Sequence, residues 1–354
     1  MMRFPLLPQT AATTITAVAL GLALAATASA AVSIDAVYFA QTHVQKPDNP
    51  YFGLVSGRDA LIKVHVVDPT TPAAPVVNAA LSLDGQNFDL SLTGPATLPA
   101  SIPDGLGVVQ HSYADSFTAM IPAAWVQPGL ELTVTAGAAS VTYTNLEIGA
   151  PTKVIMRMFD VQYFVDTNGD YPAGTLAELE AKWPVADLEV RRLPHVVFPE
   201  LVIPPRAGVA AARVSSKADY LAQTGLSFDG EQAAALAWNG ALKRAGGRSG
   251  RIYLSYVNIY GVGAGGQAGG FSGVGNGTSQ GILHHELGHA LSLPHWGNSG
   301  SYPYKGDMHG ISAPAIYNDT HAGPAWAFDL PSQAFIPATV QPGNVGGKPT
   351  GTYK

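Results

Sequence analysis

The chain contains no cysteine and few charged residues. With no Cys among its 354 residues, it has neither disulfide bonds nor a thiol nucleophile. Only 12% of the residues are charged, the net charge is −6 and no basic run occurs, so a nucleic-acid partner is not expected. The 39 glycines and 27 prolines divide the hydrophobic residues, 47% of the total, into short elements. The length is sufficient for two domains, each with its own core.

Residues 1–30 have the pattern of a secretory signal peptide. Arg3 supplies the positive charge, Ile15–Ala26 the apolar segment, and Ala28-Ser-Ala30 the small-residue cleavage site. The alternative is a retained N-terminal anchor, for which the apolar segment is short and rich in alanine. A secreted, extracellular protein without a stable membrane span is therefore predicted.

Residues 31–149 are predicted to form an N-terminal β-sandwich domain. Alternating β-branched and aromatic residues run through Val32–Phe39 and Ala60–Val67, and Asp84-Gly85 and Pro128-Gly129 mark turns. Three histidines in this region stand alone, without the spacing of metal ligands, and are interpreted as ordinary strand or loop residues: His43, His65 and His111.

Residues 150–340 are predicted to form a second, α+β domain, and residues 341–354 a Gly/Pro-rich tail, which suggests either a truncated chain or a minimal form. A strand, a short helix, a longer helix and a second strand are expected at Lys153–Val165, from Thr175 to Pro184, at Glu231–Arg244 and at Ile252–Tyr260. The loop Asp166–Asp170 resembles the start of a calcium-binding loop. It lacks that loop's later Gly and Glu, so a tight turn is the preferred interpretation.

The stretch His285-Glu-Leu-Gly-His289 carries the strongest chemical signal in the chain. Read as a helix, it places His285 and His289 on one face, one turn apart, at the spacing that two ligands of a tetrahedral Zn²⁺ require. Glu286 is directed to the side, from where its carboxylate can act as general base on a metal-bound water.

His295 is predicted to be the third ligand. Pro294 cannot continue a helix, so the chain has to turn near Ser292 and can bring His295 back to the metal. Three neutral imidazoles would leave one open position and lower the pKa of the bound water to about 7. The alternatives to His295 are three downstream carboxylates without defined spacing: Asp307, Asp319 and Asp329.

Two other motifs compete with the zinc interpretation. Gly261–Gly266 matches the dinucleotide pattern G-x-G-x-x-G, but more glycine-rich loop follows it instead of the helix that a pyrophosphate requires. A flexible wall beside the site is the preferred interpretation of these glycines, and Phe271–Val274 is a candidate edge strand for pairing with a peptide. Ser279 lies in a Gly-x-Ser-x-Gly pattern, but a glycine loop stands where the strand of a serine nucleophile elbow belongs.

The zinc motif resembles that of the metzincins, H-E-x-x-H-x-x-G-x-x-H. The segments that begin at Tyr38 and Arg58, with the glycine-rich run before the motif, resemble the secreted bacterial StcE-type mucin-degrading metalloproteases. Ser292 stands where the metzincins have Gly, and a left-handed conformation there costs about 1 kcal/mol. The resemblance implies a metzincin fold and a methionine turn, for which Met308 is the candidate by elimination. It also implies O-glycosylated, mucin-like substrates.

The sequence therefore predicts a secreted zinc endopeptidase with Glu286 as general base and one catalytic Zn²⁺ held by His285, His289 and His295. Tyr302, Tyr304 and Tyr317 are all candidates to stabilise the oxyanion. The second hypothesis is a non-catalytic secreted glycoprotein-binding protein with a structural zinc. Its weakness is that structural zinc sites usually have four protein ligands.

Overall fold

The computed structural model describes residues 31–49, 52–102, 111–165, 169–205, 208–225, 229–247, 250, 252–261, 265–293 and 326–336, and the backbone of 307–308, 311–312, 344–345 and 348–349. The predicted signal peptide lies outside this part of the chain. No helix within it has the length and apolar character to cross a bilayer. The chain is α+β with more strand than helix.

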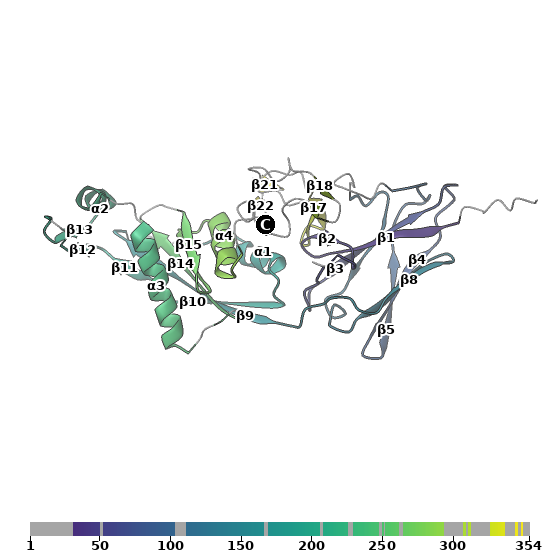
Figure 1. Ribbon diagram of the computed structural model, residues 1–354, viewed down its shortest axis with the longest axis horizontal. Helices are drawn as coiled ribbons and strands as arrows, with labels where there is room; N and C mark the ends of the chain where they lie inside the picture. The colour runs from purple at the N-terminus through teal and green to yellow at the C-terminus, as the bar shows by residue number, and fades with distance from the viewer. Residues whose placement is uncertain are drawn as a thin grey trace, which may run out of the picture.

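The first part of the chain folds into two four-stranded antiparallel sheets (Figure 1). One has the order β2-β1-β3-β6 and consists of Val44–Gln45, Ser33–Ala40, Ala60–Val67 and Phe117–Ile121. The other has the order β5-β4-β7-β8 and consists of Gln86–Leu92, Val77–Leu83, Glu131–Ala136 and Ala139–Tyr143. Asp84 and Gly85 connect β4 to β5 with φ values of 50° and 76°, which confirms the predicted turn.

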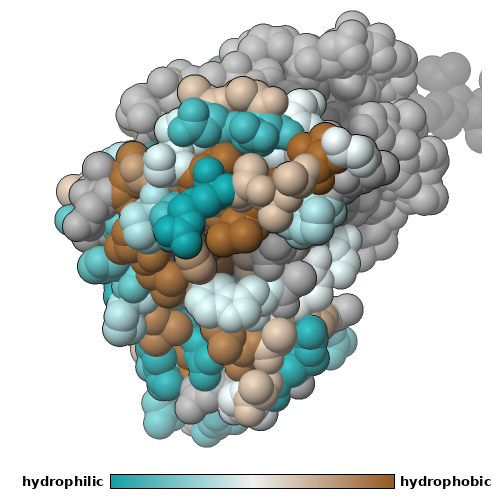
Figure 2. All heavy atoms as spheres, turned by 90° about the vertical axis from the view of Figure 1, so that its left-hand side faces the viewer, coloured by the Kyte–Doolittle hydropathy of each residue, from teal (hydrophilic) through white to brown (hydrophobic). Residues whose placement is uncertain are grey.

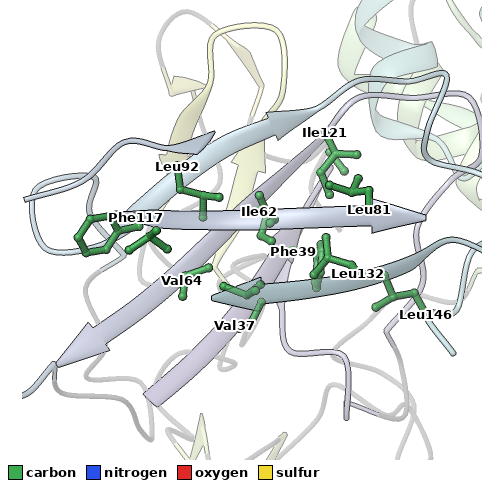
Figure 3. Packing of buried hydrophobic residues seen from close by; sticks show 14 of the residues in the cluster. Val37, Phe39, Ile62, Val64, Leu81, Leu92, Phe117, Ile121, Leu132 and Leu146 are labelled. Atoms are coloured by element: carbon green, nitrogen blue, oxygen red, sulfur yellow. The ribbon is translucent and has the colours of Figure 1, made fainter. Parts of the chain in front are cut away.

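The two sheets share one hydrophobic core. Phe39 of β1 and Ile62 of β3 lie in the same buried cluster as Leu81 of β4 and Leu132 of β7, and all four are at most 1% exposed (Figure 3). In each of these strands the residues of the buried cluster occupy alternate positions, as Ile62 and Val64 do in β3. One face of each sheet therefore packs against the other sheet. This shared core is the arrangement that a β-sandwich needs. Assignment of the region to a sandwich fold stays a prediction.

The second part of the chain is built on a sheet of order β10-β9-β14-β16-β15. These strands span Asp187–Arg192, Lys153–Tyr163, Tyr253–Tyr260, Ser272–Asn276 and Gly266–Gly269, and β11 (Val196–Phe198) also pairs with β9. The pairs of β9 with β10 and β14, and of β14 with β16, are parallel, whereas β15 runs antiparallel to β16. The sequence predicts β9 and β14, and its candidate edge strand at Phe271–Val274 overlaps β16.

Helices cover both faces of this sheet (Figure 1). Alternate residues of the central strands β9 and β14 point to opposite faces of the sheet. On one face, Met156 and Leu254 pack with α1 (Thr175–Lys182) and α4 (Gln280–Ala290). On the other face, Val161 and Val257 pack with α2 (Lys217–Thr224) and α3 (Asp229–Ala245). Helix α1 was expected and begins at Thr175, with Gly174 at its N-cap position, and the Thr175 hydroxyl donates to the Pro172 carbonyl.

Four two-stranded pairs complete the described elements: β12 (Leu201–Ile203) with β13 (Ala212–Val214), β17 (Asp307–Met308) with β18 (Ile311–Ser312), β19 (Ala327–Asp329) with β20 (Ala334–Ile336), and β21 (Asn344–Val345) with β22 (Lys348–Pro349). The β19–β20 hairpin returns to the first sheet, where Phe328 packs beside Tyr38 and Leu61. Seen from the α2 and α3 end, apolar and polar residues alternate over the surface without one continuous apolar face (Figure 2).

Candidate metal centre

The candidate site lies on α4, which packs closely on the last two strands of the sheet. Leu283 and Leu287 form the inward stripe of the helix, and both are 0% exposed. The helix contacts β16 and β15 along its length. His285 and His289 are half-buried, and Glu286 is only 5% exposed. The His-Glu-x-x-His stretch is therefore helical, as its spacing predicts.

The two imidazoles converge through their Nε2 atoms, which lie 3.0 Å apart. The rings are nearly perpendicular, with an interplanar angle of 89° and 4.6 Å between their centroids. Two imidazole nitrogens at about 2.0–2.1 Å from one tetrahedral zinc are about 3.3 Å apart. The observed pair differs from that separation by only a few tenths of an ångström. These residues therefore fit the first two ligand positions of a zinc ion.

The end of α4 orients the second imidazole. The Leu293 amide donates to the Gly288 carbonyl (3.0 Å) and the Ser292 amide to the His289 carbonyl (2.8 Å), the paired bonds of a Schellman motif. Ser292 takes the left-handed position of that motif at φ 70°, which confirms the conformation expected there. The turn places the Leu293 carbonyl 2.6 Å from Nδ1 of His289. With the proton on Nδ1, Nε2 of His289 keeps the lone pair that a metal needs.

Glu286 lies between the helix and the glycine-rich strands. A Cβ atom added at Gly266 of β15 would be 2.7 Å from both Cδ and Oε1 of Glu286. One added at Gly273 of β16 would be 3.3 Å from its Cβ. Burial raises the pKa of the Glu286 carboxyl above its ordinary value, and His289 partly offsets this effect. The carboxylate thus sits in a narrow, largely dry space lined by backbone.

Residues 266–276, which belong to the glycine-rich stretch that the sequence suggests is a loop, form a β-hairpin instead. Gly266 pairs with Gly275 and Ala268 with Gly273, so these small residues share one face of the hairpin. That face lies under α4, because Cβ atoms built on Gly266 and Gly275 meet Glu286 and Ile282. Small residues are needed here so that the helix can approach the sheet. The edge strand is also β15, not Phe271–Val274, because β16 is enclosed between β14 and β15.

Two contacts that sequence reasoning missed hold α4 in place. Gln280, the first residue of α4, donates to Glu178 of α1 at 3.2 Å, and Lys182 pairs with the same carboxylate. The C-terminal end of α1 is in turn bound by Arg58, whose guanidinium donates to the carbonyls of Ala181 (2.9 Å), Trp183 (2.7 Å), Val185 (2.8 Å) and Glu180. Nothing local in the sequence indicates these long-range pairs.

Several predicted site residues lie outside the part of the chain whose side chains the structure describes. His295, Asp319, Tyr302, Tyr304 and Tyr317 lie outside the described residues, and of Asp307 and Met308 only the backbone, in β17, is described. Within the described part of the chain no three His, Asp or Glu side chains surround a common point, so Asp329 does not join the imidazole pair. Asp329 instead accepts a hydrogen bond from Ser332 in the β19–β20 hairpin. The third ligand stays a prediction.

A helix that presents two converging imidazole nitrogens, with a buried carboxylate beside the last strand of a sheet, is the arrangement expected of a metal-dependent peptidase. The family profile of peptidase M66 matches residues 108–346, and the chain belongs to this family. All three site residues that the structure places, His285, Glu286 and His289, fall within the matched segment.

The chain is similar over most of its length to two longer proteins. The chain is 29% identical over 350 residues to "Dictomallein" of Burkholderia pseudomallei (strain 1710b), an alignment that covers 87% of this chain and 47% of the relative. It is 25% identical over 355 residues to "Dictomallein-2" of Dictyostelium discoideum, with 88% of this chain and 54% of the relative covered. The chain therefore spans about half the length of these relatives.

Proposed function

We propose that this protein is a zinc-dependent endopeptidase that uses Glu286 as its general base. The observation that carries the proposal is the pair of Nε2 atoms of His285 and His289, 3.0 Å apart, one helical position from a buried carboxylate. Membership of the peptidase M66 family supports hydrolysis of peptide bonds. A structural zinc does not require a buried carboxylate beside its ligands, so the glycoprotein-binding alternative explains less of the site.

His285 and His289 would hold the metal through Nε2, and we propose His295 as the third ligand. The Leu293 carbonyl keeps His289 in the required tautomer, since it accepts the Nδ1 proton at 2.6 Å. A zinc ion so held supplies positive charge that polarises a peptide carbonyl and acidifies a water molecule.

Glu286 performs the proton transfers. Its carboxylate accepts a proton from the water that attacks the peptide carbon, and it then donates this proton to the amide nitrogen as the C–N bond breaks. Burial favours both transfers, because it raises the pKa of the Glu286 carboxyl. This pKa is then closer to those of the water that gives up the proton and of the nitrogen that receives it.

We further propose that an extended substrate lies along β15, the strand at the α4 end of the described sheet order β10-β9-β14-β16-β15. The resemblance to StcE-type enzymes supports O-glycosylated, mucin-like extracellular proteins as substrates. Secretion through the signal peptide of residues 1–30, an N-terminal β-sandwich at 31–149 and a metzincin-like domain at 150–340 belong to the same proposal.

The variant Glu286→Gln tests the proposal. It keeps the shape of the side chain and both imidazoles but removes the base, so it should bind one zinc as the parent does and cleave casein or mucin at least about a hundredfold more slowly. A parent that binds zinc yet cleaves no protein would favour the binding-protein alternative. A variant as active as the parent would contradict the role of Glu286.

A further inference from the structure

A buried lysine on the opposite face of the sheet from α4 has no part in the chemistry proposed above. Lys243 lies in the last turn of α3 and is only 3% exposed. Burial, with Arg157 and Arg244 nearby, lowers its pKa to about 8. A largely charged ammonium group is thus kept inside the protein at neutral pH, which requires good hydrogen-bond acceptors around it.

Three backbone carbonyls provide those acceptors. Nζ of Lys243 donates to Tyr253 at the start of β14 (2.8 Å) and to Gly270 (3.3 Å) and Phe271 (2.9 Å) in the turn between β15 and β16. An ammonium group has three hydrogens, so its donors are all used. Its charge also lies 5.5 Å from the centre of the Phe271 ring.

The turn that Lys243 holds is strained. Gly269 pairs with Ser272, so Gly270 and Phe271 form a two-residue connection, with φ values of 57° and 62°. Positive φ at both positions is the geometry of a type I′ turn, which glycine adopts easily but phenylalanine only at about 1 kcal/mol. Hydrogen bonds to the carbonyls of both turn residues stabilise this geometry against relaxation.

A second polar contact joins α3 to the same hairpin. Asn239, one helical turn before Lys243 and also 3% exposed, donates to Oγ of Ser255 (2.9 Å), which lies 2.9 Å from Oγ of Ser272. Ser272 is the first residue of β16, directly after the turn. Helix α3 thus binds the closed end of the hairpin directly through Lys243, and through Asn239 by way of Ser255 of β14.

The other end of β15 meets the proposed general base. Gly266 packs against the Glu286 carboxylate, while Gly269, at the far end of this four-residue strand, leads into the turn bound by Lys243. We infer that Lys243 is a positioning residue: it fixes the β15–β16 turn and thereby holds β15 in the place where an extended peptide lies beside Glu286. This inference rests on the proposed function, because only a peptidase needs β15 in that place.

The test uses the full chain loaded with zinc and the variant Lys243→Met, which keeps the length of the side chain but removes its donors and charge. The matched control is Arg244→Met, the loss of an exposed cation at the next position of α3. Both are assayed on peptides of increasing length around one scissile bond, and hydrogen exchange is followed at residues 266–276.

For Lys243→Met we expect KM for long peptides to rise roughly tenfold with kcat changed far less, and the loss to diminish for peptides too short to reach β15. Zinc content should match the parent, and amides of 266–269 should exchange about tenfold faster or more. If the variant does not fold, Lys243→Gln, which retains two donors, should show a smaller effect of the same kind.

Parent-like KM and exchange in Lys243→Met, or an equal change in Arg244→Met, would overturn the inference and leave the proposed function standing. A uniform fall in kcat for peptides of every length would also overturn it, because that result indicates general destabilisation. A parent without peptidase activity would instead overturn the proposed function, and the exchange at 266–269 would still show whether Lys243 holds the strand.

Discussion

The backbone of Gly266 lies directly against the carboxylate of Glu286, so that even a methyl group at this position would be 2.7 Å from Oε1. An edge strand and the proposed general base are therefore in contact, although they belong to different elements. The contact requires glycine and explains why the residues before α4 carry so little side-chain volume.

The variant Gly266→Ala should lower peptidase activity strongly, because its methyl group displaces the Glu286 carboxylate or pushes β15 away from α4. We expect kcat/KM to fall at least about tenfold, with zinc still bound by the imidazoles. The control is Gly269→Ala on the same strand, where an added Cβ has nothing within 4 Å. Equal activities for the two variants would show that the contact is unimportant.

Substitutions at Ser292 should reveal the strain at the end of α4. At φ 70° a β-branched residue is unfavourable, so Ser292→Val should lower the unfolding free energy by about 1–2 kcal/mol. Glycine relieves the strain but gains freedom in the unfolded chain, so Ser292→Gly should change stability by less than about 1 kcal/mol. Urea unfolding measures both, and a valine variant as stable as the parent would contradict the left-handed assignment.

Loss of Arg58 should weaken the connection between the first sheet and α1. Arg58→Met leaves the carbonyls of Ala181 and Val185 without this donor and that of Trp183 with only the Val185 amide, which should cost about 2–4 kcal/mol. Arg213→Met is the control, since the ion pair of Arg213 with Glu200 is largely exposed and contributes about 0–1 kcal/mol. Thermal unfolding should separate the two variants by several degrees, and similar Tm values would be evidence against this connection.

Chelation should remove activity and lower Tm, and added zinc should restore both, because a ligand that binds only the folded state stabilises it. Glu286→Gln should show the same shift in Tm on zinc addition, since this substitution leaves both imidazoles in place. His289→Ala should show little or no shift. A shift of parental size in His289→Ala would place the metal elsewhere in the protein.

The burial of Glu286 should appear as a pH dependence of stability in the chelated protein. Because burial raises the folded-state pKa of this carboxyl, its protonated form favours folding, and this contribution is lost as the pH rises through the folded-state pKa. Glu286→Gln removes the charge, so at pH 7 the chelated variant should be more stable than the chelated parent. The difference should become smaller in acid. If the difference in stability between the chelated variant and the chelated parent were the same at pH 7 and in acid, burial of Glu286 would not raise its pKa.

Local spacing was sufficient to predict the helix of the site and the convergence of His285 and His289, because residues four apart on a helix always share a face. A turn near Ser292 could also be expected, since Pro294 prevents the helix from continuing. Its left-handed conformation was implied by the resemblance to the metzincins, which have Gly at this position. These features depend on a few neighbouring residues, which the sequence displays directly.

The rest of the site depends on contacts between distant elements. The β15–β16 hairpin has glycine where a strand normally shows alternating apolar residues, so its composition suggested a loop. What makes it a hairpin is its parallel pairing with β14, the approach of α4 and the hydrogen bonds from Lys243. Nothing near Arg58 or Lys243 in the sequence indicates that either is buried, because their carbonyl partners lie far along the chain or across a turn.

The most direct test of the account is a crystal grown with zinc and measured at the zinc absorption edge. The account predicts one strong anomalous peak about 2.0–2.1 Å from Nε2 of both His285 and His289, with His295 as the third protein ligand. A zinc peak at another place, or none beside these two imidazoles in a protein that still cleaves its substrate, would contradict it.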